Sequence, residues 1–334
     1  MIRPIHITDL PYLIRRQRLT SLDMPETSVR GFSPVVFALK SSLYPMRKHY
    51  RAFAYTTPTH IRSICYTHTT QNEDTLHLVA LGEFGNYSPK TEIYREKLLS
   101  SVCAWAVREG KQKVVAKVAE DDPLVEVLVS LGFTRVTEEK VFSREIFNAG
   151  SGPATPETSL AEQDIWDAWR LYNHTEPATI RRADGLTPSM WKRNHMEKTQ
   201  RKEWIVRNPE GNLAVYGSLK SGKRNYILNF FYDPDIPELE QSLRLALNLG
   251  INKISQIGHV QVYCTVREHQ DELECLLNDE GFSLLHNQLR LVLYTTAFVK
   301  SKDNQTVPSV ETNPAALQTG FFQKKDTTQK DAII

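Results

Sequence analysis

Several features that mark particular classes of protein are absent from this 334-residue sequence. No apolar run approaches the roughly 20 residues that a transmembrane helix needs, and the opening residues, MIRPIHITDL, lack the apolar core of a signal peptide. We therefore expect no membrane partner. The 41 Lys and Arg residues are balanced by 39 Asp and Glu residues, which leaves a net charge of +2. Because nonspecific nucleic-acid binding rests on an excess of Lys and Arg, this balance argues against a general nucleic-acid binder.

Cysteine is scarce, and neither cysteine nor histidine stands at metal-ligand spacing. No CxxC pair occurs, and this pattern is typical of a reduced, cytoplasmic protein rather than a disulfide framework. The histidines of the first half are scattered over strand-like segments, so we expect no metal site. The residues concerned are Cys65, Cys103, Cys264 and Cys275, and His49, His60, His68 and His77.

Apolar residues, in contrast, are abundant enough for a sizeable core. They make up 40% of the sequence, and the chain is longer than one typical domain. A segment rich in Gly, Pro, Ser and Thr lies near the midpoint, and a polar segment without periodicity ends the chain. We therefore predict two domains at 1–147 and 159–298, a linker at 148–158, and a disordered tail at 299–334.

The two halves share the same order of predicted elements. Each has three strand-like segments joined by tight turns, which predict an antiparallel meander, followed by an amphipathic helix. A strand, a short helix, a Gly-Phe pair and a further strand come next. We expect meanders at 51–56, 60–67 and 76–84, and at 204–207, 213–219 and 226–232, with the long helices at 93–109 and 238–249 and their ends at Gly110 and Gly250. We also expect a strand at 2–7 and a helix at 10–19, with a weaker version of this pair at 160–169.

This order, with Trp105-Ala106 and Gly110 in the long helix and the pairs Gly132-Phe133 and Gly281-Phe282 after it, resembles the GNAT (GCN5-related N-acetyltransferase) superfamily. The resemblance implies an α+β fold of tandem GNAT-like domains, each a mixed, mostly antiparallel sheet flanked by helices. It implies acetyl-CoA as co-substrate and a small-molecule or peptide amine as acceptor. In such folds the helix after the fourth strand binds the pyrophosphate at its N-terminus, where free N–H groups and the helix dipole favour an anion. The pantetheine arm pairs with the edge of that fourth strand.

The resemblance also implies site residues, all of them in the first half. Glu83, near the end of the fourth strand, is the candidate general base, and Tyr87 is the candidate proton donor to the leaving thiolate. As an alternative, Glu83 is an exposed carboxylate at the end of a strand. Thr91, Ile93 and Arg95 stand where the family has alternating glycines, so that signature is missing. The candidate cofactor-binding residues are Gly85, Asn86, Ser88, Lys90 and Thr91.

The corresponding loop of the second half, at 233–240, carries four carboxylates, which oppose an anion electrostatically. We therefore expect no acetyl-CoA there. Two functions remain open from the sequence. The first is an acyl-CoA-dependent N-acyltransferase with its active cleft in the N-terminal half. The second is a non-catalytic pseudo-acetyltransferase that serves as a ligand-binding or scaffold module, because both cofactor loops depart from the family pattern. A third, weaker hypothesis is an RNA or small-molecule binder that uses the basic clusters at 15–18 and 47–51.

Overall fold

The computed structural model describes residues 1–14, 17–43, 46–58, 60–69, 74–85, 89–147, 160–191, 201–222, 224–254 and 259–295. The predicted linker and the predicted tail both lie outside the described residues. Residues Met1–Ala297 form one compact unit. In the part of the chain that the structure describes, no helix is both long and apolar enough to cross a membrane.

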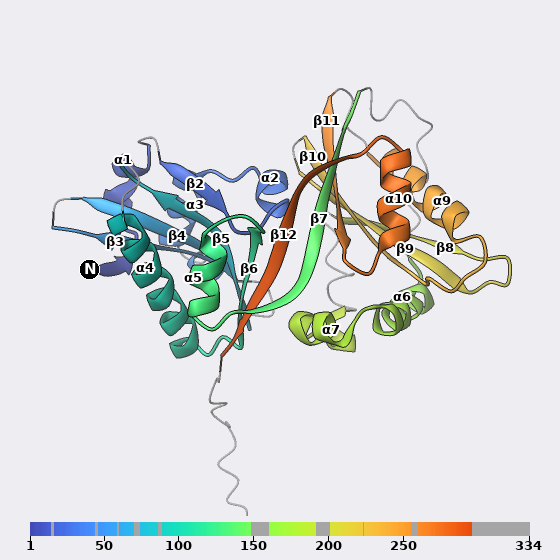
Figure 1. The fold of residues 1–334 in the computed structure, drawn as a ribbon, viewed down its shortest axis with the longest axis horizontal. Helices are drawn as coiled ribbons and strands as arrows, with labels where there is room; N and C mark the ends of the chain where they lie inside the picture. Colours follow the sequence, from blue (N-terminus) through green and yellow to red (C-terminus); the bar gives the residue numbers. More distant parts are fainter. Residues whose placement is uncertain are drawn as a thin grey trace, which may run out of the picture. The chain divides into compact units, whose positions relative to one another are not determined.

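The first half contains a short N-terminal region, then a strand meander, then alternating helices and strands (Figure 1). Its opening elements are β1 (Ile2–Pro4), η1 (Ile7–Asp9), α1 (Leu10–Leu13), β2 (Arg18–Ser21), α2 (Glu26–Arg30), α3 (Pro34–Ser42) and η2 (Met46–Lys48). The meander consists of β3 (Tyr50–Thr56), β4 (Ile61–Thr69) and β5 (Thr75–Glu83), and the later elements are α4 (Pro89–Arg108), β6 (Lys113–Ala119), α5 (Leu124–Ser130) and β7 (Thr134–Ile146).

The second half repeats the order of the later elements. It consists of α6 (Glu162–Thr175), α7 (Ala178–Asp184), β8 (Arg201–Arg207), β9 (Leu213–Ser221), β10 (Asn225–Tyr232), α9 (Leu239–Asn252), β11 (Val260–Arg267), α10 (Asp271–Asp279) and β12 (Ser283–Tyr294). The predicted meanders, long helices and Gly-Phe turns are therefore confirmed. Gly132 and Gly281 have φ values of +91° and +76°, a region that favours glycine, and each precedes a buried phenylalanine.

Three predictions about single elements are wrong. The strand and helix expected at 160–169 are helix α6 alone, which begins at Glu162, and the described residues 160 and 161 form no strand. The helix expected at 10–19 ends at Leu13, and Arg18–Ser21 form strand β2 instead, because an isolated helix of that length is marginal whereas the segment pairs with β5. Gly250 does not end α9 but lies inside it. A Cβ at this position would lie 2.7 Å from Cζ2 of Trp204, so close packing, not a helix end, explains this glycine.

All the described strands join one mixed sheet, with the order β1-β3-β4-β5-β6-β12-β7-β11-β10-β9-β8 and β2 paired to β5. Only the β5–β6 and β10–β11 pairs are parallel, so the expected mostly antiparallel sheet is confirmed. The last strands of the two halves change places (Figure 1). Strand β12 lies between β6 and β7, while β7 lies between β12 and β11. Each half therefore supplies a strand that the other half's sheet needs.

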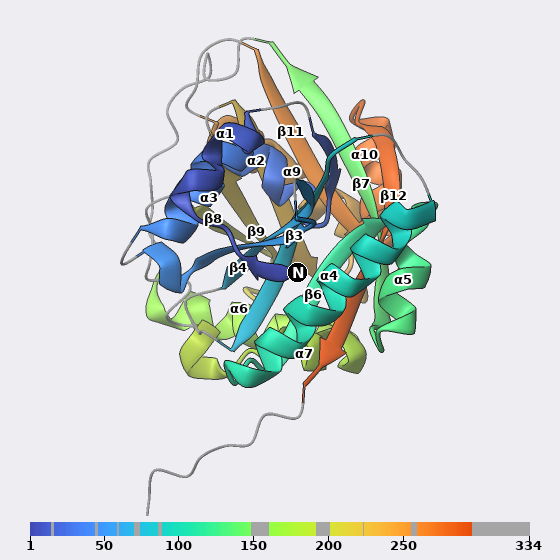
Figure 2. The ribbon, with the colours of Figure 1, turned by 90° about the vertical axis from the view of Figure 1, so that its left-hand side faces the viewer.

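Helices cover both faces of the first-half strands. Helices α4 and α5 cover one face (Figure 2), where Leu98, Val102 and Ala106 of α4 are fully buried against the sheet. Helix α3 covers the other face and inserts Phe37 among the residues of β3 and β4. The segment from β2 to α2 lies beside the end of β5 and belongs to the candidate site described below.

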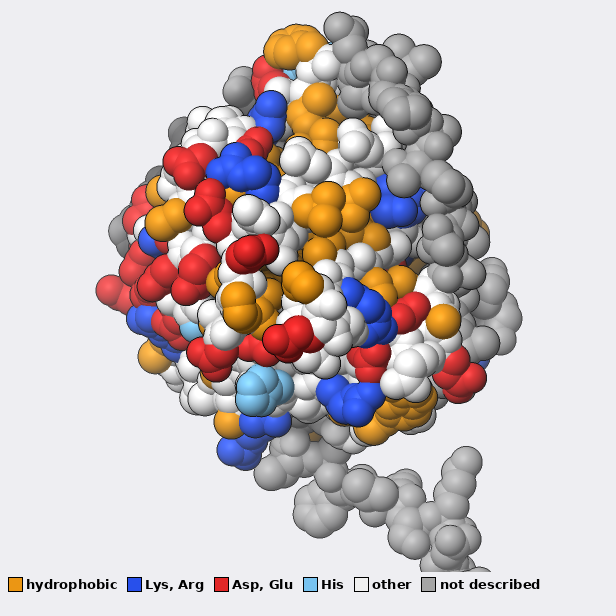
Figure 3. Space-filling view, turned by 90° about the vertical axis from the view of Figure 1, so that its right-hand side faces the viewer, with side chains coloured by type: hydrophobic (Ala, Val, Ile, Leu, Met, Phe, Trp, Pro, Cys, Tyr) orange, Lys and Arg blue, Asp and Glu red, His pale blue; other side chains and the backbone are white. Residues whose placement is uncertain are grey.

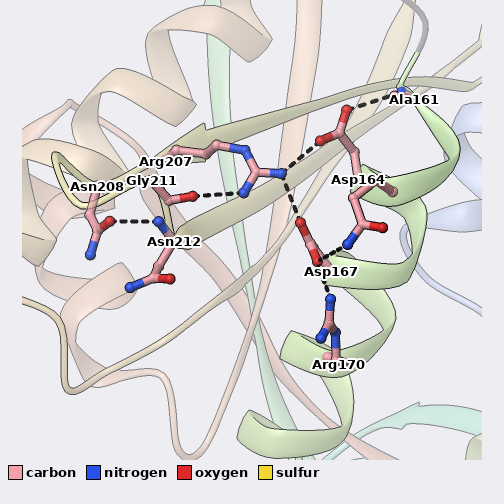
Figure 4. Close-up of polar contacts among 9 residues, drawn as sticks. Ala161, Asp164, Asp167, Arg170, Arg207, Asn208, Gly211 and Asn212 are labelled. Atoms are coloured by element: carbon pink, nitrogen blue, oxygen red, sulfur yellow. Dashed lines mark hydrogen bonds and ion pairs between the residues drawn. The ribbon is translucent and has the colours of Figure 1, made fainter.

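The second half is arranged in the same way, with α9 and α10 on one face and α6 on the other. Trp169 and Tyr172 both join the apolar cluster beneath α6. Arg207 at the end of β8 fastens α6 to the sheet (Figure 4): its Nη2 lies 2.7 Å from Oδ1 of Asp164 and 2.8 Å from Oδ2 of Asp167.

Candidate functional site

The C-terminal half of β5 separates from its parallel neighbour β6. The two strands pair only from Thr75 to His77 of β5. The pairing of β5 with β4 shifts register at Val79, which indicates a β-bulge at that residue. Beyond the bulge, Ala80–Glu83 keep β4 on one side but no longer pair with β6 on the other. We call this place, between Ala80–Glu83 and β6, the N-terminal wedge, and Val79 marks its vertex.

Strand β2 occupies the β5 side of the N-terminal wedge. It runs antiparallel to β5, with Arg18 opposite Glu83 and Ser21 opposite Ala80. At the vertex, the N–H of Leu22 donates to the carbonyl oxygen of Val79 at 2.9 Å, and the N–H of Lys117 on β6 donates to the carbonyl oxygen of Leu22 at 2.8 Å. The edge at which the resemblance to GNAT proteins would place a pantetheine arm is therefore occupied by the chain itself.

Gly82 permits the close approach of the residue that precedes β2. A Cβ on Gly82 would lie 2.2 Å from Oε1 of Gln17. That oxygen accepts a hydrogen bond of 3.2 Å from the hydroxyl of Tyr66 on β4. The glycine near the end of β5 therefore makes room for the segment that fills the wedge.

Glu83, the predicted general base, is neither free nor exposed. Its side chain is buried, and its Oε1 lies 2.9 Å from both Nε and Nη2 of Arg95 on α4. Arg95 stands at one of the positions where the family has glycine. The residue that breaks the glycine pattern thus neutralises the candidate base, a pairing that sequence reasoning missed because the two residues are twelve positions apart across a loop.

The loop after β5 is described only in part. Gly85 has a φ of +90°, so a turn begins there that favours glycine. Lys90 is exposed in the first turn of α4, and Thr91 is partly buried beside it. The positive end of the α4 dipole together with Lys90 is suited to a phosphate group. The other predicted residues of this loop, Asn86, Tyr87 and Ser88, lie outside the described residues.

In the second half, the corresponding wedge is bridged by one side chain. Strands β10 and β11 pair only from Asn225 to Leu228 of β10. Past this point the buried carboxamide of Gln270 donates from Nε2 to the carbonyl oxygen of Phe230 at 3.2 Å and accepts from the N–H of Arg267 at 3.1 Å. This amide provides partners to both separated strands. The loop before α9 carries the expected carboxylates, with Glu238 at a φ of +57°.

A buried group of charged residues lies next to the vertex of the N-terminal wedge. Nζ of Lys117 lies 3.1 Å from Oε2 of Glu139 on β7 and 3.8 Å from Oε1 of Glu26 on α2. Gln288 of β12 donates to Glu139 at 2.8 Å and to the carbonyl oxygen of Met24 at 3.1 Å. We call Asp23, Glu26, Lys117, Glu139 and Gln288 the α2 cluster. Sequence analysis missed it, although Lys117 within the otherwise apolar run 114–119 of β6 was a visible signal.

The pKa values in this region are set by burial and by neighbouring charges. Burial, reinforced by Glu26, raises the pKa of Asp23 to about 7. Burial also acts to raise the pKa of Glu26, but Lys117 and Lys220 outweigh it, so that this pKa is lowered. Burial lowers the pKa of His77, on β5, to about 3. His77 is therefore neutral at physiological pH, whereas the raised pKa of Asp23 lies close to it.

The structure also bears on the metal site and on the basic clusters that the sequence analysis considered. Among the described residues no group of three or more His, Cys, Asp or Glu side chains is placed to hold a metal ion. Arg15 and Arg16 of the first basic cluster lie outside the described residues. Figure 3 shows the face on the side of the second half, where acidic side chains gather on one side and Lys and Arg side chains are spread among other types. The basic clusters at 15–18 and 47–51 belong to the first half.

Comparison with known proteins agrees with the predicted fold. No protein-family model and no curated protein matches the sequence. Among solved structures, the GCN5-related N-acetyltransferase from Sphaerobacter thermophilus is similar, with a TM-score of 0.53 and 10% identity over 89% of this chain and 96% of that chain. A tandem GNAT protein from the clavulanic acid biosynthesis pathway gives 0.48 and 10% over 84% and 98%. Saccharomyces cerevisiae N-myristoyltransferase with bound myristoyl-CoA gives 0.43 and 10% over 87% and 80%. The chain has the GNAT fold.

Proposed function

We propose that this chain is an acyl-CoA-dependent N-acyltransferase whose active cleft is the N-terminal wedge, and that β2 closes this cleft in the state described here. One observation carries the proposal. Strand β5 keeps the bulge at Val79 and leaves β6, and the edge this creates is paired with only the four residues of β2. A long strand paired to this edge of β5 would have filled the wedge as a stable part of the sheet, whereas β2 is short.

A ligand could displace β2 from the edge of β5, because β2 is weakly held there. Arg18 and Leu19 are exposed, and the strand as a whole contributes little to the core until Leu22. Segments with few buried apolar contacts open at low free-energy cost. The amides of a pantetheine arm would give the edge of β5 the hydrogen-bond partners that it loses when β2 leaves, so no buried polar group would remain unpaired.

The residues of the cleft fit the substrate in one orientation. With the pyrophosphate at the N-terminus of α4 and Lys90, the pantetheine arm runs along Ala80–Gly82 and the thioester reaches the vertex at Val79. The acceptor amine then attacks the thioester carbonyl, the C–S bond breaks and the CoA thiolate leaves. Glu83 lies four residues along β5 from Val79, about 13 Å away, so once released from Arg95 it would take the proton of the amine through intervening water, and Tyr87 would donate a proton to the thiolate.

A non-catalytic ligand-binding or scaffold module is the second candidate function. The buried Glu83–Arg95 pair favours it, because it neutralises the base. The Gln270 bridge favours it too, because the second wedge is filled as well. This function predicts that neither wedge takes acyl-CoA, even when β2 is weakened.

The two candidates are separated by measuring acetyl-CoA binding to a variant with a weaker β2. Thr20 lies opposite Leu81, and Thr20→Pro removes a backbone N–H from β2. We expect this variant to bind acetyl-CoA at least about tenfold more tightly than the wild type, because less of the binding energy is used to displace β2. At about a hundred times Kd, binding adds about 2.7 kcal/mol to stability, which a thermal shift detects.

Two charge variants locate the site. In the Thr20→Pro background, Lys90→Glu should abolish the shift, because it places a carboxylate at the phosphate site. Asp235→Ala, in the matching loop of the second half, should leave the shift unchanged. Absence of any shift at millimolar acetyl-CoA in both wild type and Thr20→Pro excludes the acyltransferase and leaves the non-catalytic module.

A further inference from the structure

The segment that closes the N-terminal wedge continues directly into the α2 cluster. Leu22 bonds to both strands at the vertex, and Asp23 comes next with a side chain that is 6% exposed. The carbonyl oxygen of Asp23 accepts a hydrogen bond of 2.9 Å from the N–H of Thr27, so Asp23 is bonded to the first turn of α2. The hydroxyls of Ser21 and Thr27 lie 2.9 Å apart and join β2 to α2 a second time. Asp23 is therefore separated from β2 by the single residue Leu22.

Lys117 links the cluster to the vertex from the other side. Its N–H holds the carbonyl oxygen of Leu22, while its Nζ is closer to Glu139 than to Glu26. The ammonium group is therefore already compensated by a carboxylate of β7. Lys117 would therefore attract a negatively charged Asp23 only in part. Glu26, three residues along on α2, would repel it.

We propose that α2 is a pH-sensitive latch on the N-terminal wedge, in which ionisation of Asp23 beside Glu26 loosens β2 from the edge of β5. Below the transition, protonated Asp23 is compatible with burial and the wedge is closed. Above it, the carboxylate is solvated only when the segment from β2 to α2 moves outward. The latch rests on the proposed function only in that acyl-CoA is the ligand an open wedge would admit.

The charges around Asp23 determine the direction of this switch. Glu26 and Arg30 face it from α2, Lys117 from β6 and Lys220 from β9. Burial and Glu26 raise the pKa of Asp23 to about 7, although the three cations act in the opposite direction. When β2 and α2 move outward, Asp23 is hydrated and its pKa returns toward 3.8. The open form therefore gains population as the pH rises through about 7.

Amide hydrogen exchange at the vertex tests the latch without any ligand. The reporters are the N–H groups of Leu22 and Lys117, which bond to Val79 and Leu22 respectively. After correction for intrinsic exchange, we expect their protection factors to fall at least about tenfold between pH 5.5 and pH 8.5. In Asp23→Asn the fall should vanish. Asp9→Asn is the control, because Asp9 is a buried carboxylate of the same half that pairs with Arg3, away from the wedge.

A second variant keeps the proposal testable if Asp23→Asn does not fold. Glu26→Gln removes the nearest like charge, so the pH midpoint of the fall in protection should move downward. Equal protection at both pH values in the wild type overturns the latch, and so does an unchanged fall in Asp23→Asn or an unchanged midpoint in Glu26→Gln. These outcomes are independent of acetyl-CoA. A working latch with no acetyl-CoA binding at either pH rejects the proposed function alone.

Discussion

The backbone N–H of Leu22 donates a hydrogen bond of 2.9 Å to the carbonyl oxygen of Val79, the residue at the bulge of β5. This bond places a segment from the N-terminal region at the point where β5 and β6 separate. Under the proposed function, a thioester enters at this point. The bond between these two residues then holds the proposed cleft closed.

The buried pair of Glu83 and Arg95 should be costly to break. Arg95→Met would leave the carboxylate of Glu83 buried without its cation, which lowers the free energy of unfolding by about 3–5 kcal/mol. The double variant Glu83→Leu/Arg95→Met should recover most of that loss, because it leaves no unpaired charge. Urea unfolding of the three variants measures both effects. A loss below about 1 kcal/mol in Arg95→Met contradicts the buried pair.

The solvent-exposed ion pairs of Arg207 are the control for the buried pair of Glu83 and Arg95. Arg207 is partly exposed and lies within 2.8 Å of Asp164 and Asp167 on α6 (Figure 4). Because water and salt screen exposed pairs, Arg207→Met should lower the free energy of unfolding by about 1 kcal/mol or less. The same urea titration checks it, and a loss equal to that of Arg95→Met shows that burial does not separate the two sites.

The bridge across the second wedge should serve stability rather than binding. Gln270→Met would leave the carbonyl oxygen of Phe230 and the N–H of Arg267 without this partner, at a cost of about 1–3 kcal/mol. Affinity for acetyl-CoA, where it is measurable, should not change, because the proposed cleft is in the other half. An increase in affinity in Gln270→Met indicates that the second wedge is the binding site.

Asp23 should make the stability of the protein fall as the pH rises. Its pKa is about 7 in the folded protein against an ordinary value of 3.8, so the folded state binds more protons between these values. The stability that protonated Asp23 contributes is complete below about pH 4 and is lost as the pH rises through 7. Unfolding of wild type and Asp23→Asn at pH 5, 6, 7 and 8 checks this. The advantage of Asp23→Asn should grow with pH and level off near pH 8, and a constant difference contradicts the assignment.

The exchange of β7 and β12 predicts how the halves behave when they are separated. A fragment of residues 1–147 lacks β12, so β6 and β7 would have no strand between them. We expect this fragment to be unfolded or associated, since exposed strand edges pair with other chains. Circular dichroism and size-exclusion chromatography check this. A monomeric fragment that unfolds cooperatively shows that the predicted domain at 1–147 is independent.

The sequence was informative where a pattern is local. The period of Leu98, Val102 and Ala106 predicted the face of α4 that is buried, and the turns predicted the meanders. The Gly-Phe pairs at 132–133 and 281–282 lie where the repeated order placed them, and the structure adds that both glycines have a positive φ.

What the sequence could not provide depends on contacts between distant segments. Residues 10–19 contain enough apolar side chains for a helix, yet the free edge of β5 turns part of them into β2. That edge exists only because β5 leaves β6 at Val79, which no local pattern encodes. The Glu83–Arg95 pair and the α2 cluster likewise join elements that come together only in the folded sheet.

The exchange of β2 for acyl-CoA is tested most directly by monitoring the amide of Leu22 during a titration with acetyl-CoA. We predict that saturating acetyl-CoA removes the protection of the Leu22 and Lys117 amides from hydrogen exchange, because β2 leaves the wedge, while the amides of β4 keep theirs. Binding of acetyl-CoA with the Leu22 amide still protected would contradict the account, because the ligand would then bind elsewhere while β2 stays in place.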